Sequence, residues 1–126
     1  MKLEIIQTQK APAAIGPYSQ GISAGPWKFI SGQLGLDPAT GELVSEDLGG
    51  QARRALANLQ QVVEAAGATL NDVVAVDVFL TDMKAFAIFN GIYQEYFSTH
   101  KPARAVVEVR ALPKGACVEI KCIVCR

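Results

Sequence analysis

The spacing of apolar residues predicts two helices in the chain. Between Leu48 and Ala66 the apolar side chains recur every three or four residues, which is the period of a helix with one buried side. Gly67 follows this run, and glycine commonly ends a helix at such a position. Asp82 can cap a second helix, which we expect to run to about Ser98. The buried stripe of that helix is formed by Phe86, Phe89, Asn90, Tyr93 and Phe97.

Shorter segments on either side of these helices have the features of β-strands. The first six residues alternate polar and apolar side chains, as a strand with one buried face does. Segment 73–80 is almost entirely apolar, which is typical of a strand covered on both faces. The other expected strands are Gly21–Gly25, Trp27–Leu36, Ala103–Ala111 and Ala116–Val124. The resulting order, βββ-α-β-α-ββ, predicts an α/β sandwich in which two helices pack on one face of a mixed six-stranded sheet.

The composition fits a single folded domain over residues 1–126. Half of the residues are hydrophobic and only 19% are charged, which excludes a disordered chain. The 12 Lys and Arg residues balance the 12 Asp and Glu residues, so the basic excess of a nucleic-acid-binding protein is missing. No segment approaches the ~20 consecutive apolar residues of a membrane span. High apolar content with zero net charge in so short a chain is a first indication of a homo-oligomer.

The three cysteines, Cys117, Cys122 and Cys125, all lie near the C-terminus. An odd number of cysteines without an N-terminal export signal indicates reduced thiols and a cytoplasmic protein. The spacing of Cys122 and Cys125 also occurs in metal sites. This segment is expected to be a strand, however, and residues three apart in a strand point to opposite faces. We therefore expect packed thiols and no metal site.

Two ionisable residues in the last two expected strands, Arg104 and Glu119, are candidates for chemistry. Each lies on the side of its strand opposite the apolar residues. A solvated sheet face is the simple explanation for both, but Pro102 and the apolar neighbours of Arg104 favour an arginine that binds a carboxylate or phosphate. In a hairpin of these two strands, roughly 13 Å would separate Arg104 from Glu119. A site that uses both residues therefore needs strands that are not hairpin neighbours, or two subunits.

Several separated motifs occur along the chain in this order: Ala13-Ala-Ile-Gly-Pro-Tyr-Ser-Gln-Gly21, Ile30-Ser-Gly-Gln33, Gln51-Ala-Arg53, Val63-Glu-Ala-Ala-Gly67, Pro102-Ala-Arg-Ala-Val-Val-Glu-Val109 and Leu112-Pro-Lys-Gly-Ala-Cys-Val-Glu-Ile120. Together they resemble the Rid family of reactive-intermediate imine deaminases, also called the YjgF family. The resemblance covers essentially the whole chain. It implies a chorismate-mutase-like α/β fold assembled as a homotrimer with clefts between subunits. It also implies that the protein hydrolyses 2-imino acids, or their enamine tautomers, to 2-keto acids and ammonia. Pyridoxal-phosphate enzymes release these imines.

The resemblance also assigns roles to six residues: Tyr18, Ser31, Gly32, Asn90, Arg104 and Glu119. Arg104 would bind the substrate carboxylate, and Glu119 would position or activate the attacking water. The other four would line the cleft or supply polar and backbone contacts. A bidentate guanidinium suits a planar carboxylate, and one carboxylate can carry out the proton transfers of imine hydrolysis. The implied reaction therefore requires no metal or cofactor.

The four lining residues have structural explanations as well. Asn90 could be an amide at the edge of the helix, Tyr18 a ring packed after a turn, and Ser31 and Gly32 strand residues at a close backbone approach. The sequence also departs from the family pattern at Val106, where many members have cysteine. Valine removes thiol chemistry at this position and leaves hydrolysis intact. Segment 97–102 is shorter than in some members, which leaves the substrate preference open.

Two further residues and a second function complete the sequence-based expectations. His100 is the only histidine and has no nearby Asp or Ser partner in the sequence, so we do not expect a catalytic base there. Asp77 lies among apolar strand residues and is either buried with a hydrogen-bonding partner or faces a neighbouring subunit. The alternative function is a non-enzymatic trimer that binds small carboxylates or acts on other proteins, since some relatives are linked to translation inhibition, RNA cleavage or chaperone-like behaviour. Zero net charge disfavours RNA as a ligand.

Overall fold

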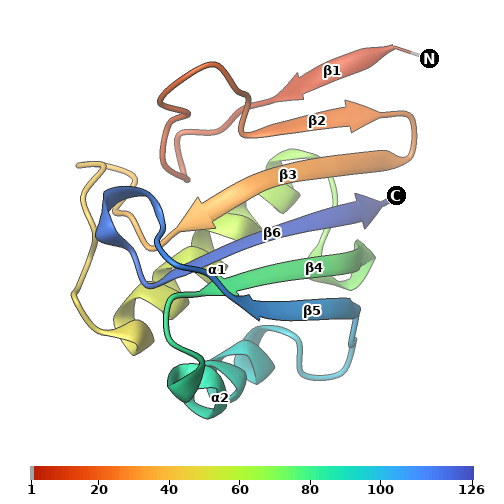
Figure 1. The fold of residues 1–126 in the computed structure, drawn as a ribbon. Helices are drawn as coiled ribbons and strands as arrows, with labels where there is room; N and C mark the ends of the chain where they lie inside the picture. The colour runs from red at the N-terminus through yellow and green to blue at the C-terminus, as the bar shows by residue number, and fades with distance from the viewer. Residues whose placement is uncertain (1) are drawn as a thin grey trace.

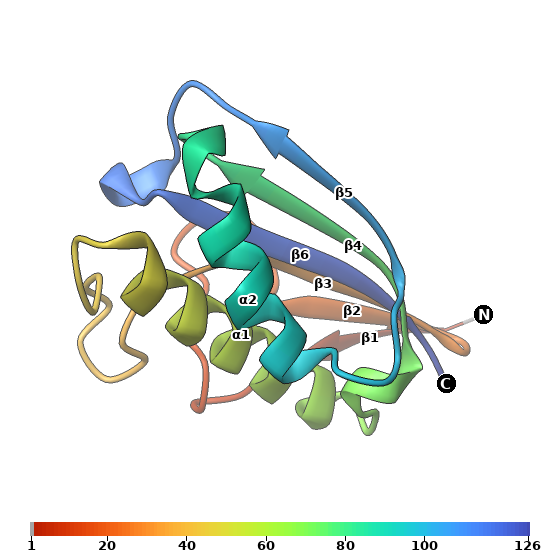
Figure 2. The same cartoon turned by 90° about the horizontal axis from the view of Figure 1, so that it is seen from below.

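Six strands form one mixed sheet and two α-helices cover one of its faces (Figures 1 and 2) in a computed structural model of the chain, which describes residues 2–126. The strands are β1 (Leu3–Ile6), β2 (Gly21–Ala24), β3 (Trp27–Leu34), β4 (Val73–Leu80), β5 (Ala103–Glu108) and β6 (Val118–Cys125). The helices are α1 (Leu48–Ala65) and α2 (Phe86–Tyr96), and single 3₁₀ turns lie at Leu70–Asp72, Met83–Ala85 and Pro113–Gly115. The predicted element order and the placement of both helices on one face are confirmed.

The strands are arranged in the sheet in the order β1-β2-β3-β6-β4-β5. All neighbours are antiparallel except β4 and β5, which are parallel and connected through α2. The last strand of the chain therefore lies in the middle of the sheet, between β3 and β4, and β5 forms an edge (Figure 1). The last two strands are consequently not hairpin neighbours, which removes the simple hairpin geometry considered for Arg104 and Glu119.

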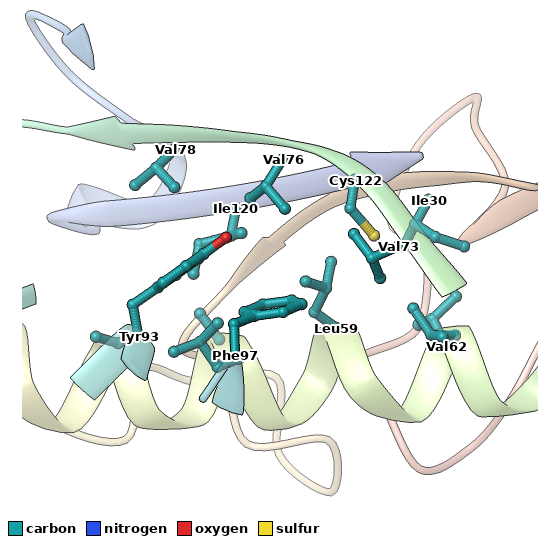
Figure 3. Packing of buried hydrophobic residues seen from close by; sticks show 14 of the residues in the cluster. Ile30, Leu59, Val62, Val73, Val76, Val78, Tyr93, Phe97, Ile120 and Cys122 are labelled. Atoms are coloured by element: carbon teal, nitrogen blue, oxygen red, sulfur yellow. The ribbon is translucent and has the colours of Figure 1, made fainter. Parts of the chain in front are cut away.

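The hydrophobic core lies between the sheet and the helices (Figure 3). Helix α1 is amphipathic, and its buried apolar residues follow the predicted period: Ala52, Ala55, Leu56, Leu59, Val62 and Val63. They pack against alternate residues of the central strands, such as Val76 and Ile120, and against Phe89 and Tyr93 of α2. Full burial of one such large side chain stabilises the fold by about 1.5–3 kcal/mol.

Both ends of α1 carry specific caps. The side chain of Asp47 accepts a hydrogen bond of 2.9 Å from the backbone N–H of Gly50, which satisfies one of the free donors at the helix N-terminus. At the other end Gly67 has a φ of +80° and donates its N–H to the carbonyl of Glu64. The predicted role of Gly67 at the end of the helix is confirmed, because this left-handed conformation is easily adopted only by glycine.

The second helix begins later than predicted. The carboxylate of Asp82 accepts a hydrogen bond of 2.9 Å from the backbone N–H of Lys84 and caps the 3₁₀ turn Met83–Ala85, and α2 starts only at Phe86. Other boundaries differ by one to three residues from the prediction. In particular, β5 ends at Glu108, whose carboxylate accepts a hydrogen bond of 2.7 Å from the backbone N–H of Met83. The contact between Glu108 and Met83, which are distant in the sequence, thus helps to fix where these elements begin and end. Local sequence patterns alone do not determine these boundaries.

The sheet face without helices, which we call the open face, carries a continuous apolar row across all six strands. Residues paired in register on this face are Ile5, Ile22, Phe29, Ile123, Ala75 and Ala103. Side chains of this row are accessible: Ile5 of β1 is 69% exposed and Phe29 of β3 is 47% exposed. A contiguous exposed apolar surface of this kind marks an interaction surface.

The cysteines lie in and just before β6 as free thiols. Cys122 is buried toward the helices, whereas Cys125 pairs with Trp27 on the open face, so the two thiols point to opposite faces as expected. In the described part of the chain, neither helix is both long enough and apolar enough to cross a membrane.

Candidate functional site

Arg104 and Glu119 lie on opposite faces of the sheet. Arg104 is paired with Val76, whose side chain is buried beneath the helices, so the guanidinium lies on the helix side. Glu119 is paired with Phe79 and lies on the open face. Each residue lies on the side of its strand opposite the apolar residues, as predicted. The apolar side of β5, however, lies on the open face, whereas the apolar side of β6 lies on the helix side. Within one protomer the two side chains therefore cannot reach a common substrate.

The reason for this arrangement is that the sheet has two apolar faces. In the central strand β6, the apolar side packs against the helices through residues such as Ile120. In the edge strand β5 the apolar side, which includes Ala105 and Val107, lies on the open face, and Val107 is 45% exposed. The two strands are not hairpin neighbours, but this alone does not bring Arg104 and Glu119 together, because the residues lie on opposite faces. A site that uses both residues therefore needs two subunits.

Four of the six candidate residues border one cavity of about 600 Å³, which we call the glutamate cavity. Its lining includes Tyr18, Ser31, Gly32 and Glu119. Strand β3 shifts its register against β6 between Ile30 and Gln33, so Ser31 and Gly32 occupy an irregular stretch next to Glu119. Such bulges redirect backbone and side chains and are frequent near functional sites.

The environment of Glu119 favours its neutral form more than water does. Partial burial raises the pKa of Glu119 above its ordinary value, and the nearby ammonium of Lys121 opposes this effect. Lys121 also lies 4.0 Å from the carboxylate of Asp77 on the open face. Asp77 is thus half-buried beside a cation, and among described residues its ion-pair partner is Lys121.

Gly32 leaves the space that the Glu119 carboxyl group occupies. A methyl group added at Gly32 would lie 2.8 Å from the carboxyl carbon of Glu119, well inside van der Waals contact. Beside it, the hydroxyl of Ser31 donates a hydrogen bond of 2.5 Å to the carbonyl oxygen of Ser19. The Ser31 hydroxyl therefore holds the preceding loop, and its oxygen keeps accepting capacity toward the cavity.

Tyr18 stands at the rim of the glutamate cavity. It follows Gly16, which has a φ of +127°, and its backbone N–H donates to the Gly16 carbonyl at 2.9 Å, so the chain makes a tight bend there. Tyr18 is 53% exposed in the single chain, so its ring is not packed in the core of its own protomer. The phenol oxygen accepts a 3.4 Å hydrogen bond from the backbone N–H of Ile15 and remains able to donate its own proton.

Arg104 and Asn90 border a second cavity of about 340 Å³ on the helix side, which we call the arginine cavity. Its lining residues come from α2, from the following loop and from β5: Asn90, Tyr93, Gln94, Phe97, Lys101, Pro102 and Arg104. Two buried oxygen atoms at this site, Asn90 Oδ1 and Tyr93 Oη, have no hydrogen-bond partner. Within residues 2–126, Arg104 forms no ion pair with a carboxylate.

The sequence assigned no role to two residues that the structure places at these cavities. Lys121 borders the glutamate cavity. The sequence could have indicated this, because Lys121 lies two residues after Glu119 in an expected strand and therefore on the same face. Tyr93 lies one helical turn after Asn90, and its ring faces the Arg104 guanidinium. In the sequence Tyr93 could not be distinguished from the apolar stripe of its helix.

Three other residues have structural surroundings in the fold. The ring nitrogen Nε2 of His100 lies 2.6 Å from the backbone carbonyl of Val73, so the imidazole ties the loop after α2 to β4. Val106 packs against the hydrophobic core. Within residues 2–126 no three His, Cys, Asp or Glu side chains come together as metal ligands.

The sheet order and the two helices define a chorismate-mutase-like α/β protein. Residues 8–126 match the family described as Endoribonuclease L-PSP, and the chain belongs to this family, which is the Rid or YjgF family. A RutC family protein of Pyrococcus horikoshii is 52% identical to this chain over 120 residues, which cover 95% of each protein. The 2-iminobutanoate/2-iminopropanoate deaminase of Bos taurus is 48% identical over 120 residues, covering 95% of this chain and 88% of the bovine protein.

The fold expected from the resemblance is also confirmed by solved structures. The structure of E. coli TdcF with bound serine has a TM-score of 0.93 to this chain at 43% sequence identity, and 98% of each chain is covered. At this level of identity and coverage the family's fold applies to the chain from end to end.

Proposed function

We propose that the protein hydrolyses 2-imino acids, or their enamine tautomers, to 2-keto acids and ammonia, in sites formed between the subunits of a homotrimer. The deaminase name of the bovine relative supports the reaction. The serine bound to TdcF supports a ligand with an α-carboxylate, as a 2-imino acid has. The observation that carries the proposal is that Arg104 and Glu119 border two half-sites on opposite faces of one sheet.

Arg104 provides the carboxylate-binding half. Its guanidinium is exposed, and within the described residues no carboxylate occupies its N–H groups. A free guanidinium can form two parallel hydrogen bonds to a planar carboxylate. Asn90 Oδ1, buried in the same cavity without a partner, is an acceptor suited to a donor such as the imine N–H.

Glu119 provides the acid–base half. As a carboxylate it accepts a proton from water as the water oxygen bonds to the imine carbon, and it passes that proton to the imine nitrogen, which gives a neutral carbinolamine. It then accepts the hydroxyl proton of the carbinolamine and passes it to the amino nitrogen, so the C=O bond forms as the C–N bond breaks and ammonia leaves. One carboxyl group serves both steps because the reaction consumes one water and leaves Glu119 unchanged. Its raised pKa brings the carboxyl closer to the working pH, which favours proton transfer in both directions.

The open face and the position of β5 support assembly. Arg104 lies on an edge strand, where a neighbouring copy can approach it, and Glu119 lies on the open face. The apolar row on that face, including Ile5 and Phe29, is surface that association would remove from water. We further propose a cytoplasmic location, which the free thiols support.

A coupled assay tests the reaction. A threonine dehydratase converts threonine to 2-iminobutanoate, and semicarbazide traps the imine as semicarbazone before it hydrolyses to 2-ketobutyrate. We expect the protein to lower the rate of semicarbazone formation and Arg104→Ala to abolish this effect. Arg110→Ala, which removes another exposed arginine just beyond β5, is the matched control and should behave as wild type. An unchanged rate with the wild-type protein would rule out the proposed reaction.

Complementation tests whether the site joins two subunits. Arg104→Ala and Glu119→Gln should each be inactive alone. When the two are co-expressed in equal amounts, about three quarters of random trimers contain both, and each mixed trimer has one intact site in three. Activity should therefore return to about a quarter of the wild-type value. No recovery, with mixed assemblies verified by two affinity tags, would show that each site lies within one subunit.

The alternative, a binding protein without catalysis, predicts a different result from the same materials. In that case 2-ketobutyrate would bind with Arg104-dependent affinity while the rate of semicarbazone formation stayed the same.

A further inference from the structure

The guanidinium of Arg104 lies over two aromatic rings of α2. Its central carbon lies 4.6 Å from the ring centroid of Tyr93 and 5.9 Å from that of Phe86. Both distances are within the range of about 6 Å over which a cation interacts with an aromatic face. The contact with Tyr93 is the shorter, and Tyr93 also borders the arginine cavity.

The ring of Tyr93 is a fixed support. The residue is 7% exposed, and its ring stacks on Phe97 with centroids 4.8 Å apart and a tilt of 28°. The centroid of the Phe89 ring also lies 5.7 Å from that of Tyr93. Figure 3 shows the side chains of Tyr93 and Phe97 next to each other on the helix side of the sheet. Arg104 itself is exposed, so without this ring little would restrict its long side chain.

The way in which an arginine is held decides which of its donors stay free. A carboxylate that orients a guanidinium occupies the same N–H fork that a substrate carboxylate needs. An aromatic ring instead contacts the flat face of the guanidinium, and all five N–H donors, which lie in its plane, remain free. No carboxylate within residues 2–126 pairs with Arg104, so the stacked ring is what remains to orient it.

We infer that Tyr93 is a positioning residue that orients Arg104 for carboxylate binding through its ring and not through its hydroxyl. The inference rests on the proposed function in one respect, the assignment of the substrate carboxylate to Arg104. The Tyr93 hydroxyl is buried without a partner and makes no hydrogen bond to Arg104. The aromatic face of Tyr93, and not its polar atom, therefore determines how tightly a 2-keto or 2-imino acid binds.

The test measures the dissociation constant of 2-ketobutyrate by isothermal titration calorimetry on the assembled protein. Tyr93→Phe keeps the ring and should bind within about twofold of wild type. Tyr93→Leu removes the ring and should weaken binding about 3- to 10-fold, because ordering one freed side chain costs about that factor. If the leucine variant does not fold, pentafluorophenylalanine at position 93 preserves the shape of phenylalanine but reverses the charge of the ring face. It should weaken binding relative to Tyr93→Phe by a similar factor.

Two controls separate positioning from general damage. Ile92→Ala removes a buried side chain of the same helix that belongs neither to the arginine cavity nor to its aromatic contacts, and it should leave binding within about twofold. In an Arg104→Ala background, Tyr93→Leu should have no further effect, because the two residues act as a unit. Equal binding by the phenylalanine, leucine and fluorinated variants would overturn the inference. That result would leave the proposed function intact, whereas wild-type binding that does not depend on Arg104 would contradict the proposed function itself.

Discussion

The contact between Gly32 and Glu119 offers a sharp test of the glutamate cavity. In Gly32→Ala the new methyl group would lie 2.8 Å from the carboxyl carbon of Glu119 and 3.0 Å from one of its oxygens. Non-bonded carbon atoms pack at about 3.5–4.0 Å, so the carboxyl group must move by roughly 0.7 Å or more. The backbone of Gly32 is not in the left-handed region, and the obstructed group is the end of a side chain. The fold should therefore tolerate the change while the carboxyl group is displaced.

A displacement of about 1 Å at a reacting group can cost on the order of 100-fold in rate, so we expect Gly32→Ala to lose about 10- to 100-fold in the semicarbazide assay. The midpoint of thermal unfolding should change little. Gly91→Ala adds the same methyl group on the helix at a position with no atom within 4 Å. It should retain full activity and gain up to about 1 kcal/mol of stability. Adding Gly32→Ala to Glu119→Gln should have no further effect on activity, because Glu119→Gln already removes the carboxyl group through which the methyl group acts. Near-wild-type activity of Gly32→Ala would refute a role for the observed carboxyl position.

Three further predictions concern titration and burial. Burial raises the pKa of Glu119, so the fold favours the neutral form of this residue. Glu119→Gln should therefore raise the midpoint of thermal unfolding at pH 7. This gain should shrink as the pH falls through the pKa of Glu119, because the wild-type carboxyl group is then neutral as well. A gain independent of pH would contradict this cause. Lys121 lowers the same pKa, so Lys121→Met should move the acidic limb of the activity profile to higher pH, and an unmoved limb would exclude this coupling. Tyr93→Phe removes a buried hydroxyl without a partner and should stabilise the fold by about 1 kcal/mol in urea denaturation; a clear loss would show that the hydroxyl is bonded in solution.

The helices and strands were predictable because local patterns determine them. The period of α1 and the glycine at its end identify the helix to within one residue, and the apolar run of β4 identifies that strand. The start of α2 was not predictable in the same way. Asp82 is a good cap in either a 3₁₀ turn or an α-helix, and Glu108, distant in sequence, accepts a hydrogen bond from the first turn.

The arrangement of the candidate site was only partly predictable. Alternation along β5 and β6 correctly assigned Arg104 and Glu119 to the side away from the apolar residues of each strand. It could not show which side faces the helices, because in β5 the apolar side lies on the open face. The pairing of β6 with β3 and β4 depends on contacts between distant parts of the chain, and no local pattern encodes it.

The separation of Arg104 from Glu119 has a chemical consequence. An arginine and a glutamate that face each other at hydrogen-bond distance form an ion pair, in which the guanidinium N–H groups are occupied and the pKa of the carboxyl falls. Both effects would oppose the proposed reaction, which needs a free guanidinium fork and a carboxyl that exchanges protons. A sheet between the two residues prevents that pairing within a protomer, and stacking on Tyr93 orients the guanidinium without a carboxylate. In an assembled site, substrate and water would then lie between the two groups and hold them apart.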